Sequence, residues 1–171
     1  MSPIPELSQY RLSIDLFDRA LLDLLAERAR MARGCSVCVS DRGMIWHGMG
    51  HNREAMARGL SAPFLEQFGG LLDQMGSWQV PSPLTGLVLD DLLGSLEVLD
   101  RTILMILSER FKVVRRIGAL KRANDMAPLD PRRWHSLLSE RLDKGEVLGL
   151  DRDWTRQLFE AIHDYALHLE S

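Results

Sequence analysis

The sequence predicts an all-α protein, and three observations support this. Apolar residues recur at the helical period of about 3.6 residues along most of the chain. Segments of alternating β-branched residues, which are typical of strands, are missing from it. Apolar residues make up 46% of the 171 residues. This is enough for the core of one compact domain, or of two small halves that share a core.

The first half of the chain predicts three helices. Residues Leu7–Arg33 carry a helical apolar stripe, which Gly34 interrupts. The stretch that follows, "GCSVCVSDRGMIWHGMGHN", is weakly patterned and predicts a loop. We expect a short helix at Asn52–Arg58, where Asn52 can act as N-cap, and a third helix at Pro63–Met75.

The second half predicts the same order of one long helix and two shorter ones. Pro, Gly and Ser residues mark Gly76–Gly86 as a connector, and a long helix is expected at Leu87–Ala123. Asp followed by Pro signals a helix start, which predicts the next helix from Asp130 to about Lys144. The last helix is expected over Asp151–Glu170, with its first residue as N-cap.

An internal duplication relates the two halves. The segment "SIDLFDRALLDLLAERARMAR" from Ser13 aligns without a gap with "SLEVLDRTILMILSERFKVVR" from Ser95. The offset is 82 residues throughout, so that Asp18 aligns with Asp100 and Arg28 with Arg110. A three-helix unit cannot bury its apolar stripe alone. We therefore expect two halves, residues 1–80 and 87–171, packed on one another about a pseudo-two-fold axis.

Two cations lie on the apolar stripe of the second long helix. Arg110 and Lys121 are eleven residues apart, which returns them to nearly the same helix face as Val114 and Ile117. Either cation alone could extend from the edge of a core or end a helix. Together they also fit a pocket for a small anion.

These residues resemble the all-helical chorismate mutase family, the AroQ class. The stretches "LDRTILMILSERFKVVRRIGALK", "LDPRRWHSLL" and "GLDRDWTRQLFEAIHDYALHLE" follow that family's three-helix order over about Leu92–Glu170. In the family two chains pair through their long helices, and each active site takes one arginine from the partner chain. The resemblance implies an isomerase that converts chorismate to prephenate without a nucleophile, a metal or a cofactor.

Carried over by position, the resemblance assigns roles to residues of the second half. Arg110 resembles the arginine that binds a substrate carboxylate, and Lys121 the lysine that contacts a carboxylate and the ether oxygen. Asp130 and Arg133 match the pair that opens the second helix, and Glu170 matches a Gln or Glu that faces the ether oxygen.

The arginine that the family takes from a partner chain has its match in the first half, at Arg11. Its position in the second half is Leu93, and the first half has Val39 in place of the lysine. We therefore expect an intramolecular pseudo-dimer with one working pocket, formed by Arg11 together with the residues of the second half. The other pocket, around Arg28, should be dead or filled.

Glu170 and two further positions leave the chemistry open. A carboxylate would repel an oxygen that gains negative charge, so Glu170 could donate only as the protonated acid, and activity would fall with rising pH. As the second-to-last residue, Glu170 could instead fray. The family often has Glu at the position of Trp134 and Ser at that of Ala166. These departures suggest an altered substrate, such as 4-amino-4-deoxychorismate or isochorismate.

Three functions therefore stay open at this point. The first is a mutase that acts on chorismate or an analogue, and the second is an isochorismate pyruvate lyase that releases salicylate and pyruvate. The third is a non-catalytic protein that binds an aromatic metabolite or regulates another enzyme.

Composition restricts the partners. The net charge of −3 argues against nucleic acid, and the longest apolar run, "TILMIL", is too short to span a bilayer. The N-terminal "MSPIPELSQYR" does not resemble a signal peptide, so a cytoplasmic protein is expected. A zinc site at Cys35, Cys38, His47 and His51 is a weak alternative, because the loop between the pairs is shorter than usual. Whether the pseudo-dimer is a monomer or pairs further is open.

Overall fold

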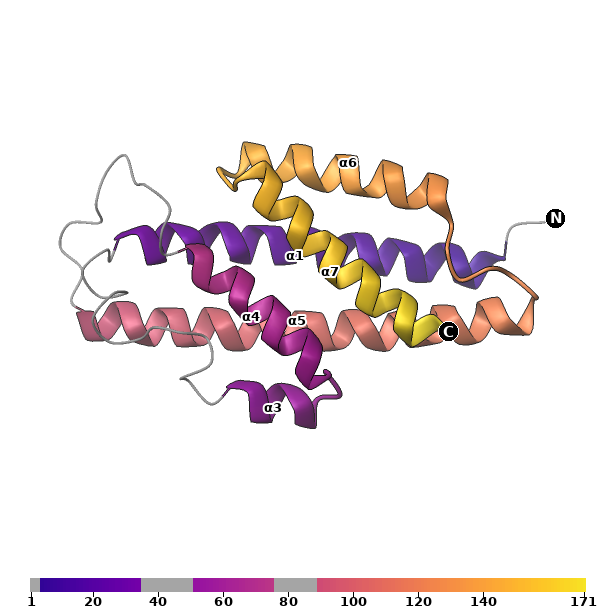
Figure 1. Ribbon diagram of the computed structural model, residues 1–171, viewed down its shortest axis with the longest axis horizontal. Helices are drawn as coiled ribbons and strands as arrows, with labels where there is room; N and C mark the ends of the chain where they lie inside the picture. The colour runs from indigo at the N-terminus through magenta and orange to yellow at the C-terminus, as the bar shows by residue number, and fades with distance from the viewer. Residues whose placement is uncertain (1–3, 35–50, 76–88) are drawn as a thin grey trace. The chain divides into compact units, whose positions relative to one another are not determined.

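The computed structural model describes residues 4–34, 51–75 and 89–171, and within them the protein is all-α (Figure 1). The described residues form six helices and no strand, which confirms the predicted fold class. In chain order the helices are α1 (Pro5–Gly34), α3 (His51–Ala57), α4 (Ala62–Gln74), α5 (Leu89–Ala123), α6 (Pro131–Val147) and α7 (Arg152–Glu170).

The chain divides into two compact units, and both long helices contribute to each of them. The first unit contains residues 1–22 of the α1 region and residues 106–171, which include the end of α5 and all of α6 and α7. The second unit contains residues 23–105, with α3, α4 and the remainder of the long helices. The duplication into residues 1–80 and 87–171, and its pseudo-two-fold axis, stay predictions.

Aspartate caps start the two shorter helices of the first unit. Asp130 and Asp151 each accept a hydrogen bond from the backbone N–H three residues on, at 3.1 and 2.8 Å. Helices α6 and α7 pack against each other and are joined by a short turn (Figure 1). The apolar stripes of the unit's helices form a core that includes Leu107, Phe111, Leu142, Leu158, Phe159 and Ile162.

Leucines and two stacked phenylalanines contribute to the core of the second unit. Ser61 caps α4 and accepts a hydrogen bond from the backbone N–H of Phe64. The rings of Phe64 and Phe68 stack on this helix with their centroids 5.7 Å apart. They are buried together with Leu25, Ala29, Leu65, Leu72, Leu96 and Ile103.

Several helix bounds differ from the expected ones by one to three residues. Helix α3 begins at His51 and not after Asn52, and α4 begins one residue before Pro63, because Ser61 is its N-cap. Helix α6 continues to Val147, three residues beyond Lys144, and ends where Gly149 takes a positive φ of 80°. A residue without Cβ adopts that left-handed conformation at little cost, so the glycine sets the end of the helix.

Candidate active site

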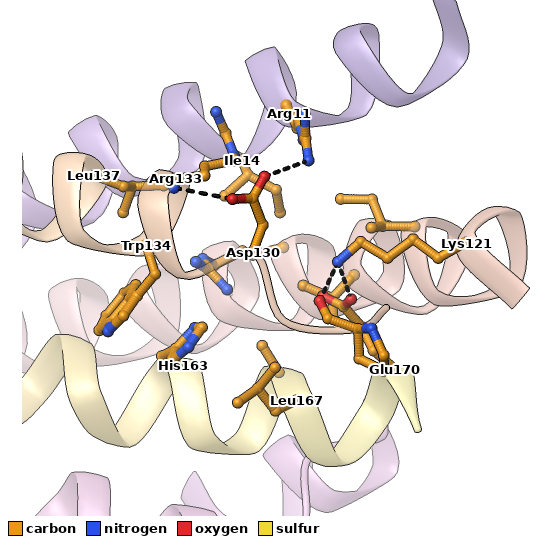
Figure 2. Close-up of a pocket in the computed structure, with 15 residues that line it drawn as sticks. Arg11, Ile14, Lys121, Asp130, Arg133, Trp134, Leu137, His163, Leu167 and Glu170 are labelled. Carbon is orange, nitrogen blue, oxygen red and sulfur yellow. Dashed lines mark hydrogen bonds and ion pairs between the residues drawn. The ribbon is translucent and has the colours of Figure 1, made fainter. Parts of the chain in front are cut away.

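One pocket of the first unit brings together all six residues to which the sequence assigned a role in binding or catalysis. Helix α1 contributes one of them, α5 two, the N-terminus of α6 two and the end of α7 one (Figure 2). In chain order these residues are Arg11, Arg110, Lys121, Asp130, Arg133 and Glu170. Their shared place is a structural finding, whereas their chemical roles stay predictions.

Arg110 is held in the pocket wall by a buried carboxylate of α1. Its Nε donates to Oδ1 of Asp18 at 2.7 Å, and its Nη2 to Oδ2 at 3.4 Å. Both side chains are buried, and the guanidinium carbon lies 5.5 Å from the ring centroid of Phe111. Within the described residues, the third nitrogen, Nη1, is buried without a hydrogen-bond partner. Since buried polar groups are nearly always bonded, Nη1 is a donor suited to an anionic ligand.

A second buried arginine, which sequence reasoning missed, supports this arrangement. Arg141 of α6 is 1% exposed, and it donates to Asp18 at 3.3 Å and to Asp15 at 2.7 Å. Asp15 also lies 3.5 Å from the guanidinium of Arg133. The signal was present, because Arg141 stands on the apolar face of its helix next to Leu142, as Arg110 does on α5.

The N-cap of α6 also takes part in the pocket. Asp130 accepts the backbone N–H of Arg133 at 3.1 Å and the guanidinium of Arg11 at 3.4 Å (Figure 2). Burial lowers the pKa of Arg133, and the charges of Arg11 and Arg141 lower it further, against opposing effects of Asp15 and Asp130. An arginine pKa starts so high that the guanidinium stays charged, so the shift mainly reports the burial of this side chain.

Lys121 and Glu170 are tied together on the opposite side of the pocket. The ammonium of Lys121 donates to Oε2 of Glu170 at 2.5 Å and also to the carbonyl of Pro128 (Figure 2). Both side chains of the ion pair are about nine-tenths buried. Glu170 is therefore a buried part of the pocket wall in this conformation.

An aromatic stack forms a further part of the wall. The indole of Trp134 and the imidazole of His163 are parallel within 4°, with their centroids 3.8 Å apart. Burial lowers the pKa of His163, and the charges of Arg110 and Lys121 lower it further, against an opposing effect of Asp164. The imidazole is therefore neutral near pH 7.

Cationic side chains outnumber carboxylates in the lining of the pocket. Among the described residues that line it, four cationic side chains face two carboxylates, while Asp18 and Asp15 lie behind the lining against Arg110 and Arg133. Apolar side chains fill the rest of the wall, including Ile14, Val114, Ile117, Leu137 and Leu167. Such a site suits a small, largely apolar anion.

In the second unit, each guanidinium nitrogen of the corresponding arginine has a hydrogen-bond partner. Arg28 pairs with Asp100 at 2.6 Å, and its Nη1 donates to the carbonyl of Leu72 at 3.2 Å and to Sδ of Met75 at 3.8 Å. Protein atoms thus bind Nη1 of Arg28, whereas Nη1 of Arg110 has no partner among the described residues. Val39, Cys35, Cys38 and His47 lie outside the described residues, as does the side chain of Leu93.

Most of the residues that line the cationic pocket lie in the second sequence half. A comparison with known families matches the same half. Residues 92–171 match the family model of chorismate mutase type II. This segment is a chorismate mutase type II domain. Chorismate mutases are isomerases, so the domain belongs to a family of enzymes, as the resemblance implied. Arg11 lies outside the matched segment, although it lines the same pocket.

The other comparisons add no relative. No curated protein and no solved structure was found to match the chain. Within the described ranges, no His, Cys, Asp and Glu side chains cluster in a way that could hold a metal ion. Helices long and apolar enough to cross a membrane are also absent from those ranges.

Proposed function

We propose that the chorismate mutase domain binds chorismate in this pocket and rearranges it to prephenate. The observation that supports this most directly is a pocket lined by four cationic side chains and an apolar wall, most of whose residues belong to the segment that matches the family. Chorismate is a small dianion with a largely apolar ring, so its carboxylates can pair with cations of the lining while its ring contacts the apolar wall.

Arginines of the pocket would hold the two carboxylates. The Nη1 of Arg110 is a buried donor with no partner among the described residues, and Asp18 fixes the plane of its guanidinium. Arg11 and Arg133 flank the other side, where Arg11 contacts Asp130 at 3.4 Å. Fixing both ends of the substrate selects its compact, reactive conformer before the reaction begins. Arg11 comes from outside the matched domain, so the first sequence half would complete the site.

Lys121 would stabilise the transition state. The rearrangement breaks an ether bond, and negative charge grows on the ether oxygen as it breaks. A fixed ammonium in a buried wall stabilises that charge more than it stabilises the ground state. Enzymes lower such barriers by at least ~8 kcal/mol. We attribute this to Lys121 together with the orienting arginines.

The charges near the ring favour chorismate over its aminated analogue. An ammonium group on the ring would lie in a pocket where Arg110 and Lys121 already oppose a positive charge at His163. A hydroxyl group carries no such penalty, so we propose a ring that bears a hydroxyl.

The test is to incubate the purified protein separately with chorismate, 4-amino-4-deoxychorismate and isochorismate and to identify the products. Prephenate from chorismate is the expected result. Salicylate with pyruvate from isochorismate would instead identify a lyase. No turnover of any of the three, together with tight binding of a bicyclic diacid that mimics the transition state, would identify a non-catalytic binding protein and overturn the proposal.

A further inference from the structure

Helix α5 approaches the end of α7 unusually closely at Gly118. A Cβ at this position would lie 2.8 Å from the Cα of Glu170 and 3.3 Å from its carbonyl oxygen. Both atoms belong to the backbone, which cannot rotate away as the end of a flexible side chain can. Only glycine therefore allows this approach without moving the last turn of α7.

Two residues that follow Gly118 in α5 both donate hydrogen bonds to Glu170. Lys121 and Arg122 follow three and four positions later, so they lie on the face of α5 that carries Gly118. Lys121 donates to the carboxylate of Glu170 at 2.5 Å, and Arg122 donates to its carbonyl oxygen. The carbonyls of the last helical turn lack partners within the helix, so Arg122 supplies one from α5.

We propose that Gly118 and Arg122 are positioning residues that set the carboxyl group of Glu170 against Lys121. Gly118 lets the backbone of Glu170 come close, and Arg122 fixes its carbonyl, so a residue next to the end of the chain becomes a rigid part of the pocket. The catalytic consequence rests on the proposed function, whereas the geometric one does not.

Substitutions at two other glycines serve as controls. They show the effects that a Gly→Ala change has without displacing Glu170. Gly94 lies in the same helix with nothing within 4 Å of an added Cβ, so Gly94→Ala changes helix propensity alone. At Gly145 an added Cβ would lie 3.1 Å from the side chain of Thr155, and neither residue lines the pocket. Gly145→Ala therefore tests a close helix contact away from the site.

The kinetic test compares kcat and KM of these variants on chorismate. We expect Gly118→Ala to lower kcat about tenfold or more with a much smaller change in KM, because the displaced carboxylate no longer fixes the ammonium of Lys121 beside the reacting oxygen. Gly94→Ala and Gly145→Ala should keep the kcat of the wild type. In the background of Glu170→Ala, Gly118→Ala should lower kcat no further, since there is no carboxyl group left to misplace.

A crystal structure of Gly118→Ala gives a readout that does not depend on activity. We expect the Glu170 carboxylate to move beyond hydrogen-bond distance from Lys121, compared with 2.5 Å in the wild type. If Gly118→Ala does not fold, Arg122→Gln loosens the same residue without adding bulk, and the same loss of kcat and of the Lys121 contact is expected.

Wild-type kcat in Gly118→Ala, an equal loss in the Glu170→Ala background, or an unchanged Lys121–Glu170 distance would each overturn the inference. A wild-type protein that turns over no substrate would overturn the proposed function instead. The distance in the variant would then still decide whether Gly118 positions Glu170.

Discussion

Arg110 and Asp18 form a buried ion pair in the first unit. Arg28 and Asp100 form the equivalent pair in the second unit, where the arginine comes from the first sequence copy and the aspartate from the second. Arg110 donates to Asp18 at 2.7 and 3.4 Å, and Arg28 donates to Asp100 at 2.6 and 3.5 Å. In the aligned sequence copies Arg28 corresponds to Arg110, and Asp18 to Asp100. Each pair thus joins one residue of the first copy to one of the second, as a duplicated and exchanged dimer would require.

The two pairs differ in what the third nitrogen of the arginine contacts. The protein occupies Nη1 of Arg28 through Leu72 and Met75, whereas Nη1 of Arg110 has no partner among the described residues. This difference supports the expectation of one working pocket, and it makes the two arginines matched probes of stability and of binding.

Replacement of each arginine by lysine should separate these two effects. Lysine keeps the charge but loses the two-point geometry, so Arg28→Lys and Arg110→Lys should each lower the free energy of unfolding by about 1–3 kcal/mol. Arg110→Lys alone should also lower kcat/KM, by roughly 10- to 100-fold, because it removes a charge-assisted donor to the substrate. Urea unfolding and steady-state kinetics measure both quantities. Equal loss of activity in the two variants would contradict the assignment of a single working pocket.

Arg11→Ala should lower activity while it leaves the fold intact. The contact of Arg11 to Asp130 is 3.4 Å long and partly exposed, so its loss should change the free energy of unfolding by less than ~1 kcal/mol. The loss of a carboxylate-binding guanidinium should nevertheless lower kcat/KM by about tenfold or more. Arg19→Ala is the control, because Arg19 also reaches from α1 to α6, at 3.7 Å from Glu140, without lining the pocket. Wild-type kinetics in Arg11→Ala would exclude a role of Arg11 in binding the substrate.

The sequence predicted the helices well because their signals are local. Apolar periodicity and the caps Asp130 and Asp151 lie within one or two turns of the bounds that they set. Arg110 and Lys121 were found because cations on an apolar stripe are conspicuous. The residues that bind them were not predicted. Asp18, for example, lies 92 residues from Arg110 in the sequence, and no local pattern pairs the two.

Other parts of the site depend on tertiary contacts in the same way. The stack of Trp134 on His163 joins two helices, and the approach of Gly118 to Glu170 depends on the path of the chain backbone. Composition and spacing contain no information about either. The resemblance to a family placed residues at the pocket, but it did not predict how Asp15 and Asp18 orient them.

Stability should depend on pH through His163. Burial and the charges of Arg110 and Lys121 lower the pKa of His163 from its ordinary 6.5, against Asp164. The unfolded chain therefore binds a proton at this residue at a higher pH than the folded protein does. The free energy of unfolding should fall as the pH drops below 6.5, until the pH passes the lowered pKa of the folded state.

The comparison of His163→Phe with the wild type isolates this contribution. Phenylalanine keeps an aromatic ring against Trp134 but cannot bind a proton, so the fall in stability between pH 7 and 5 should become smaller. His135→Gln controls for the loss of an exposed histidine of the same unit. Urea unfolding at several pH values measures the effect, and identical pH profiles for His163→Phe and the wild type would contradict it.

Arg141→Leu should lower both the free energy of unfolding and the affinity for substrate, although Arg141 does not line the pocket. Its guanidinium is 1% exposed and holds both Asp15 and Asp18. Removal of one partner from a buried ionic network costs about 3–5 kcal/mol. Arg101→Leu is the matched control, because its pair with Glu97 is exposed and should contribute under ~1 kcal/mol.

The kinetic consequence of Arg141→Leu follows from what the two aspartates hold. Asp18 orients Arg110, and Asp15 lies 3.5 Å from Arg133, so loss of Arg141 frees both carboxylates to shift and the two pocket arginines with them. We expect a higher KM with a smaller change in kcat, because Lys121 and Glu170 are held independently by α5 and α7. Steady-state kinetics at a temperature well below the unfolding transition of the variant measures this. A loss of stability without any change in KM would mean that Arg141 supports the core alone.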